Sequence, residues 1–178
     1  MTRENAAMPI PAPLLKGARR DYTLGRLVEM TPTDPTTPTE RRILGLVLPP
    51  WQRPEVWTVE QKRRFIEGIF LGLGCGYYVT NGLEWVQSGA SAPMSGWLID
   101  GQQRISAIRD FLSGELVAFG DVRFPDLSEP QKMRFCRTPF PCFELDYCEN
   151  ETVLMELYDR LNFGGTPHTP EQRALPKD

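Results

Sequence analysis

The sequence predicts an α+β fold in which a small mixed sheet is surrounded by about four helices. Short apolar runs of strand length alternate with segments whose apolar residues recur at the three- and four-residue spacing of a helix. Turns that contain glycine or proline separate these segments. The 178 residues suffice for one domain with its own core.

Residues 1–40 are expected to form an extension, and residues 41–178 the domain. Two stretches of the extension are rich in proline and threonine, which propagate neither a helix nor a central strand. Residues 19–30 between them are expected to form at most one short element. This composition predicts that the arm is dispensable for folding.

The first half of the domain is expected to begin with a buried strand at Ile43–Leu48, which Pro49 and Pro50 end. Thr58 and Gln61 have the spacing of a capping box and predict the start of an amphipathic helix. The elements expected next are a strand within residues 74–82 and two strands around a turn within residues 83–100.

The second half is expected to begin with a helix that ends near Gly114. The elements expected after it are an extended stretch at 116–127, a helix capped by Ser128 and Gln131, a strand within 140–148, a helix at 151–161 and a capped helix start at Thr169.

Composition excludes some classes of partner. The net charge is −3, with 40% hydrophobic and 24% charged residues, so no overall field attracts nucleic acid or an acidic membrane. DNA contact would require a local patch such as residues 62–64, whose alternative interpretation is a solvated helix face.

Cysteine usage and the absence of a leader indicate a cytoplasmic protein with reduced thiols. The cysteines are Cys75, Cys136, Cys142 and Cys148, and they include no C-x-x-C pair. The sequence shows neither a signal peptide nor a membrane span. A single histidine, His168, argues against a Cys/His zinc site.

The strongest functional signal lies in residues 97–112, where an apolar strand leads through a polar turn into an amphipathic helix. A helix N-terminus attracts anions because its first N–H groups are unpaired. Gly101 would permit the turn, and Arg104 could clamp phosphate oxygens. Asp100 would then hold Mg²⁺ or accept a proton. The alternative is that Asp100 only caps the helix and Arg104 pairs with a surface acid.

The stretch LIDGQQRISAI resembles the signature of the ParB/sulfiredoxin-like superfamily. It is most similar to the D-G-Q-Q-R branch found in the N-terminal part of GmrSD-type restriction enzymes. Two further motifs of that branch occur in the expected order, at residues 49–70 and 158–173. The resemblance implies a ParB/sulfiredoxin-like fold with a nucleotide-phosphate pocket.

The resemblance also implies roles for individual residues. Catalytic roles fall to Asp100, Arg104 and Glu171, with Asp100 as the metal ligand. The nucleotide-binding residues are Gln52, Arg53, Gly101, Gln102, Gln103, Asn162, Gly164, Gly165 and His168. His168 departs from the family, which usually has an aliphatic residue there.

Several of these residues have a structural alternative. Asn162 is typical of a helix C-cap, and Arg53 could simply cover a neighbouring tryptophan. Glu171 lies in a helix first turn, where acids are favoured, and His168 could be a solvent-facing turn residue.

The expected function is therefore Mg²⁺-dependent binding of a nucleoside triphosphate (NTP) and its hydrolysis, linked to DNA restriction, modification, phage defence or counter-defence. One alternative is a kinase that phosphorylates a hydroxyl of a DNA base or small molecule. Another is a non-catalytic nucleotide- or DNA-binding subunit. One histidine leaves no H-N-H nuclease in this chain, so a separately encoded nuclease or modification enzyme is an expected partner.

Overall fold

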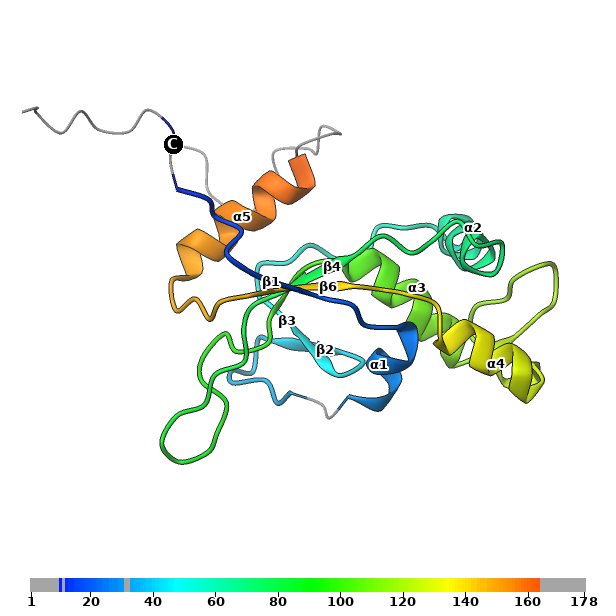
Figure 1. Cartoon of the computed structure of the whole chain (residues 1–178), viewed down its shortest axis with the longest axis horizontal. Coiled ribbons are helices and arrows are strands. Elements are labelled where there is room, and N and C mark those ends of the chain that lie inside the picture. The colour runs from blue at the N-terminus through cyan, green and yellow to red at the C-terminus, as the bar shows by residue number, and fades with distance from the viewer. Residues whose placement is uncertain (1–9, 11, 31–32, 164–178) are drawn as a thin grey trace, which may run out of the picture.

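The computed structural model describes residues 10, 12–30 and 33–163, which form an α+β domain (Figure 1). The strands are β1 (Gly17–Arg20), β2 (Arg41–Ile43), β3 (Leu46–Leu48), β4 (Tyr78–Thr80), β5 (Leu98–Asp100) and β6 (Cys142–Leu145). The helices are α1 (Leu24–Glu29), α2 (Val59–Phe70), α3 (Gln102–Leu112), α4 (Glu129–Cys136) and α5 (Glu151–Phe163), with a 3-10 helix at Phe124–Asp126. The fold class expected from the sequence is confirmed, with five α-helices in the described residues.

The main sheet is mixed, with strand order β1-β6-β4-β5. β6 runs parallel to β4 and antiparallel to β1, and β4 pairs antiparallel with β5. In this register Val79 lies opposite Asp100, so the last residue of β5 lies beside the first half of β4. The polar turn after β5 therefore lies at the end of the sheet where β4 and β6 begin.

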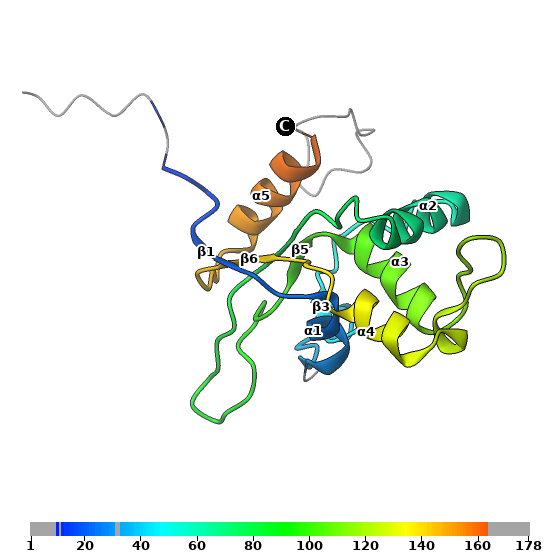
Figure 2. The same cartoon turned by 45° about the vertical axis from the view of Figure 1, so that its right-hand side comes forward.

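Both faces of the sheet are covered, because side chains alternate along each strand. Tyr78 and Leu98 belong to a core cluster shared with α1, α2, α3 and α4. Val79 and Ile99 belong to a second cluster, which α5 covers. Figures 1 and 2 show α5 set apart from the other four helices, across the strands. The candidate functional site lies at the end of the sheet that both α3 and α5 approach.

Two helices begin as their sequence predicts. Thr58 accepts a hydrogen bond from the Gln61 backbone N–H, and the Gln61 side chain accepts one from Thr58 in return. Ser128 and Gln131 form the same capping box at the start of α4. Such local hydrogen bonds satisfy N–H groups that have no partner inside the helix, so they are readable from sequence.

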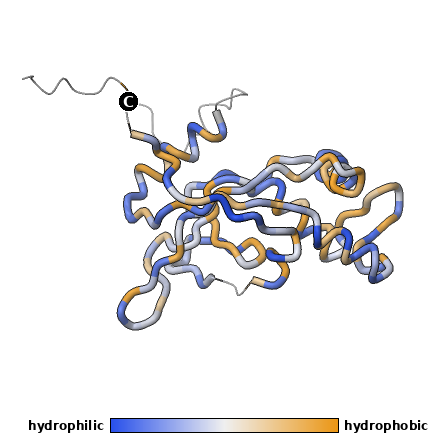
Figure 3. Tube along the Cα trace, viewed as in Figure 1, coloured by the Kyte–Doolittle hydropathy of each residue, from blue (hydrophilic) through white to orange (hydrophobic). Residues whose placement is uncertain are grey.

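The expected N-terminal extension is partly wrong, because residues 17–29 belong to the fold. β1 is an edge strand that pairs with β6 over four residues. Figure 3 shows it as a hydrophilic stretch, which explains why its sequence does not look like a strand. In α1, Leu24 and Leu27 are 1% and 2% exposed within the larger core cluster.

Three local expectations also differ from the structure. Residues 41–48 form a hairpin, β2–β3, rather than one strand, since Leu44 adopts a left-handed conformation with φ 51°. Only one strand, β5, forms within residues 83–100, and the preceding loop projects from the domain in both views. Residues 116–127 contain a single bridge and the 3-10 helix. The helix start expected at Thr169 lies outside the described residues.

All four cysteines are free, as the sequence predicts. Within the described residues, no helix has the length and apolar character needed to cross a membrane.

Candidate functional site

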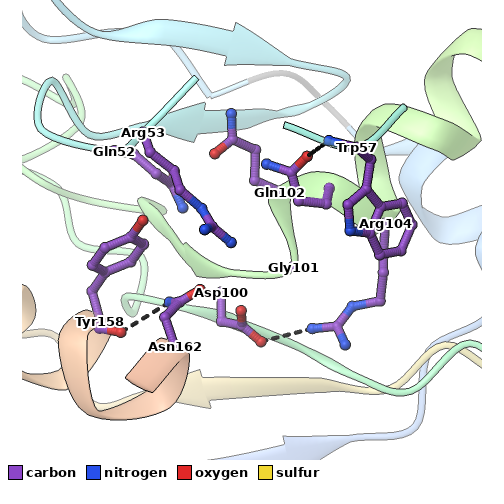
Figure 4. Close-up of a pocket in the computed structure, with 10 residues that line it drawn as sticks. Gln52, Arg53, Trp57, Asp100, Gly101, Gln102, Arg104, Tyr158 and Asn162 are labelled. Carbon is purple, nitrogen blue, oxygen red and sulfur yellow. Dashed lines mark hydrogen bonds and ion pairs between the residues drawn. The ribbon is translucent and has the colours of Figure 1, made fainter. Parts of the chain in front are cut away.

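A pocket of about 160 Å³ opens at the junction of β5 and α3. Three separate segments line it: the β3–α2 loop, the β5–α3 turn and the C-terminal half of α5 (Figure 4). Its lining residues are Gln52, Arg53, Trp57, Asp100, Gly101, Gln102, Gln103, Arg104, Tyr158 and Asn162. The structure therefore brings together all the expected site residues that it describes, although they come from three distant parts of the chain.

Gly101 allows the strand to turn directly into α3. It is the N-cap of the helix, with φ 109°, a conformation that side chains rarely adopt. A Cβ here would lie 2.6 Å from the Cβ of Tyr78, so a side chain does not fit. Gly101 makes no side-chain cap hydrogen bond to the first N–H groups of α3, and the residues of this first turn line the pocket. The alternative role of Asp100 as the helix cap is thus wrong.

Asp100 and Arg104 form an ion pair inside the pocket. The Arg104 guanidinium donates a hydrogen bond from Nη2 to Oδ2 of Asp100 at 2.7 Å. Both side chains are about one quarter exposed, at 23% and 27%. Arg104 thus pairs with an acid, as the alternative expected, and this acid is Asp100 of the same turn. The ion pair holds the guanidinium beside the start of α3.

Arg104 is supported from behind by the segment before β4. A Cβ on Gly76 would approach Nη1 of Arg104 to 3.2 Å, so the guanidinium lies directly against this glycine. Burial raises the pKa of the neighbouring Cys75 thiol to about 11, although the charge of Arg104 opposes the shift. The thiol is thus a neutral packing group. Sequence reasoning missed Gly76, because its role depends on a residue in another element.

Two glutamines that line the pocket have buried polar atoms without a partner among the described residues. Gln52 and Gln102 are each 4% exposed. Gln52 donates from Nε2 to the Ile99 carbonyl at 3.4 Å, but its Oε1 has no partner among the described residues. Gln102 Nε2 and Arg104 Nε are buried without a described partner as well. Buried polar atoms without partners cost about 1–3 kcal/mol each, so this pocket has the character of a site built for a polar ligand.

The remaining wall comes from Arg53 and the end of α5. In Figure 4, Arg53 extends toward Asp100 from the side opposite Arg104. Burial raises the pKa of the Tyr158 phenol, and the nearby Arg53 offsets part of this effect. Asn162 donates to the Tyr158 carbonyl at 2.9 Å, which is a contact within its own helix. Asn162 therefore lines the pocket, and its side chain also makes a hydrogen bond within the last turn of α5.

Gln103 lines the pocket and also holds the β3–α2 loop in place. Its Oε1 accepts hydrogen bonds from the backbone N–H groups of Val56 and Trp57 at 2.9 and 3.0 Å. Its Nε2 lies 3.5 Å from the Pro54 carbonyl. The carboxamide thus fastens the β3–α2 loop to α3. Since this loop carries Gln52 and Arg53, Gln103 positions the pocket wall.

A charged cluster reinforces that attachment. Lys62 of α2 bridges Glu55 of the loop and Asp110 of α3, at 2.7 and 2.6 Å. Arg109 contacts both acids as well. Lys62 is 9% exposed, so it is not part of a free basic patch. Arg63 and Arg64 of the same run pair with Glu60, in keeping with a helix face rather than a DNA-binding patch.

Four expected site residues, Gly164, Gly165, His168 and Glu171, lie outside the described residues. Within the described residues, no group of three His, Cys, Asp or Glu side chains could hold a metal ion. Tyr158 and Trp57 also line the pocket. Their place follows from the packing of α5 and the β3–α2 loop, not from a motif.

This fold and pocket define an α+β domain with a polar site at a strand-to-helix turn. Residues 39–137, more than half of the chain, match the family of the GmrSD restriction endonuclease N-terminal domain. The chain belongs to this family. The match includes β2 to α4 and two of the three segments that line the pocket, whereas β1, α1, β6 and α5 lie outside it. Neither a curated protein nor a solved structure matches the chain.

Proposed function

We propose that the pocket binds the phosphates of an NTP and that the chain hydrolyses it in a DNA restriction, modification or phage-defence system. The observation that carries this proposal is the set of buried, unpartnered polar atoms on Gln52, Gln102 and Arg104 around one pocket. They surround an uncapped helix N-terminus, which favours anions. Membership in a restriction endonuclease family supports the biological setting.

The charge of the pocket favours an anion, although the whole chain is acidic. Its described lining contains two arginines and one aspartate, while the chain has a net charge of −3. Arg104 and Arg53 would neutralise phosphate oxygens, and Gln102 would donate a hydrogen bond from Nε2. Phosphoryl transfer depends mainly on positioning and charge stabilisation, so such a site needs no covalent nucleophile.

Magnesium fits this pocket only in combination with the phosphates. Asp100 is the single carboxylate among the described lining residues, and Oε1 of Gln52 is a further oxygen without a described partner. Mg²⁺ often binds through one or two carboxylates together with phosphates and water. A bound Mg²⁺ would neutralise phosphate charge. We expect Asp100 to supply one ligand or to accept a proton from the attacking water.

A non-catalytic nucleotide-binding subunit is the second candidate. Oδ2 of Asp100 already accepts a hydrogen bond from Arg104, which reduces its availability as a base or metal ligand. Under this proposal the pocket would bind the nucleotide and regulate a separately encoded nuclease or modification enzyme. The sequence resemblance to the ParB/sulfiredoxin-like superfamily is compatible with either candidate.

The test is equilibrium binding of the four NTPs with and without Mg²⁺, followed by a phosphate-release assay. Mg²⁺-dependent binding with turnover supports hydrolysis, and binding without turnover supports the regulatory subunit. The matched control is Arg104→Ala, which should lose binding in either case. Failure of every NTP to bind the wild-type chain would refute the proposal.

A further inference from the structure

The proposed phosphate pocket is too small to hold a whole nucleotide. Its volume of about 160 Å³ is below the ~300–1,000 Å³ of most small-molecule sites. If the phosphates lie between Asp100 and Arg104, the base must lie in a neighbouring part of the molecule. This step rests on the function proposed above.

A larger and more apolar cavity lies beside that pocket. It has a volume of about 430 Å³ and is formed by the segments before β1 and β4 and by the start of β6. Its walls include Leu15, Tyr77, Pro141 and Phe143. Tyr78 faces the opposite core, so alternation along the chain places Tyr77 on the α5 side of the sheet. The Tyr77 side chain is 44% exposed, so a ligand could contact its ring.

Gly76 separates the two cavities. It lines the apolar cavity, and Arg104, which lines the polar one, lies directly behind it. Because glycine has no side chain, only the backbone of Gly76 lies between the guanidinium and the apolar cavity at this point; a Cβ would be 3.2 Å from Nη1. A phosphate bound to Arg104 would therefore lie next to the apolar cavity, whose walls include aromatic side chains.

We infer that the apolar cavity receives the base of the nucleotide whose phosphates bind at Arg104, with the base packed on the ring of Tyr77. The polar pocket offers charges and hydrogen-bond donors, whereas Leu15, Pro141 and Phe143 offer apolar contact. An anionic tail joined to a flat heteroaromatic ring is the chemistry that this pair of neighbouring cavities would recognise.

The experiment compares two probes that separate the cavities. Tripolyphosphate fills only the polar pocket, whereas each NTP also presents a base. Tyr77→Ala should weaken NTP binding by ~10- to 100-fold, the usual effect of losing a base–aromatic contact, and leave tripolyphosphate binding unchanged. Tyr77→Phe keeps the ring and should bind like the wild type. Trp85→Ala is the control, because Trp85 is an exposed aromatic residue (58%) on the projecting loop.

The outcomes distinguish this inference from the function on which it rests. If tripolyphosphate binds but Tyr77→Ala binds NTPs like the wild type, the base lies elsewhere and the inference is wrong. The same conclusion follows if NTPs bind the wild type no more tightly than tripolyphosphate. If neither probe binds, the phosphate pocket itself is wrong and the inference falls with it. Melting temperatures of the three variants verify that each is folded.

Discussion

The guanidinium of Arg104 donates a 2.7 Å hydrogen bond to Asp100, the residue one helical turn before it, across the start of α3. Gly101 is the N-cap of this helix and Asp100 is not. Among the described residues, the acid is therefore held by Arg104 and not by a capping contact. Its carboxylate and the guanidinium form one charged pair that lines the pocket.

This pair yields the most direct prediction. If the pair acts on a phosphate, Asp100→Asn should lower turnover by ~10²–10³, the usual cost of losing one preorganised charge contact. Arg104→Lys should also lose activity, because lysine keeps the charge but not the planar fork. A pair one quarter exposed contributes only ~0–1 kcal/mol to stability, so melting temperatures should change little. Wild-type turnover and NTP affinity in both variants would leave the pair a purely structural role.

Gly76 and Gly74 offer a matched test of how Arg104 is placed. Both have positive φ, 72° and 83°, so alanine should cost each a similar ~1–2 kcal/mol. Only at Gly76 would the new Cβ press on Arg104; around Gly74 there is open space. We expect Gly76→Ala to lose roughly tenfold in NTP affinity beyond Gly74→Ala, since 1 Å of misplacement can cost ~10². Equal affinities in the two variants would show that the guanidinium adapts.

The parts of the fold that the sequence predicts are those with local causes. Thr58 with Gln61 marks the start of α2, and Gly101 marks the turn into α3, because each acts on residues within one helical turn. The hairpin at residues 41–48 was missed, since a six-residue apolar run is equally typical of one buried strand. β1 was missed because its partner, β6, lies more than a hundred residues away.

The site residues also divide into those that local sequence places and those that depend on distant segments. The residues of the D-G-Q-Q-R turn are adjacent in sequence, so their meeting in one pocket needs no tertiary information. The use of Gln103 could not be predicted, because its partners Val56 and Trp57 belong to another segment. Its neighbour Gln102 also lines the pocket, and its Nε2 is buried without a partner among the described residues. Two adjacent glutamines thus differ in role only through what folds against each.

Gln103 should act through the loop it holds. Gln103→Ala removes the acceptor for the N–H groups of Val56 and Trp57, and each unsatisfied group costs ~1–3 kcal/mol if it stays buried. We expect faster amide hydrogen exchange at both residues and weaker NTP binding. Gln103→Glu keeps an acceptor oxygen and should retain slow exchange. Unchanged exchange in the alanine variant would show that other contacts hold the loop.

The N-terminal helix provides a test of the corrected domain boundary. Leu27 and Val28 are neighbours in α1, but Leu27 is 2% exposed and Val28 is 54% exposed. Leu27→Ala should lower the free energy of unfolding by ~2–5 kcal/mol, whereas Val28→Ala should change it by no more than ~0.5 kcal/mol. Denaturant titration of the two variants measures the difference. Equal stabilities would restore the expectation that this arm is dispensable.

The Glu55–Lys62–Asp110 cluster predicts how stability depends on pH. Partial burial raises the pKa of Glu55, but the hydrogen bonds and charges of Lys62 and Arg109 outweigh it and hold that pKa below its ordinary value of 4.5. Burial likewise lowers the pKa of Lys62, but its two acids outweigh this effect and raise it above 10.5. The Glu55 contribution is present above about pH 4.5 and is lost as the pH falls through the depressed pKa.

The Lys62 contribution has the opposite sign. It is complete below pH 10.5 and is lost as the pH rises through the elevated pKa, so the contribution of these two groups should be level between these limits. Lys62→Met removes the shared partner of two acids that are 30% and 13% exposed. The cost at pH 7 should be at or below the ~3–5 kcal/mol of a fully buried pair. Because Glu55 then keeps only Arg109, its pKa should rise and the acid limb should flatten. Denaturant titrations from pH 3 to 8 measure both the cost at pH 7 and the loss of stability at acid pH. If stability falls as steeply with acid in Lys62→Met as in the wild type, Lys62 does not depress the pKa of Glu55.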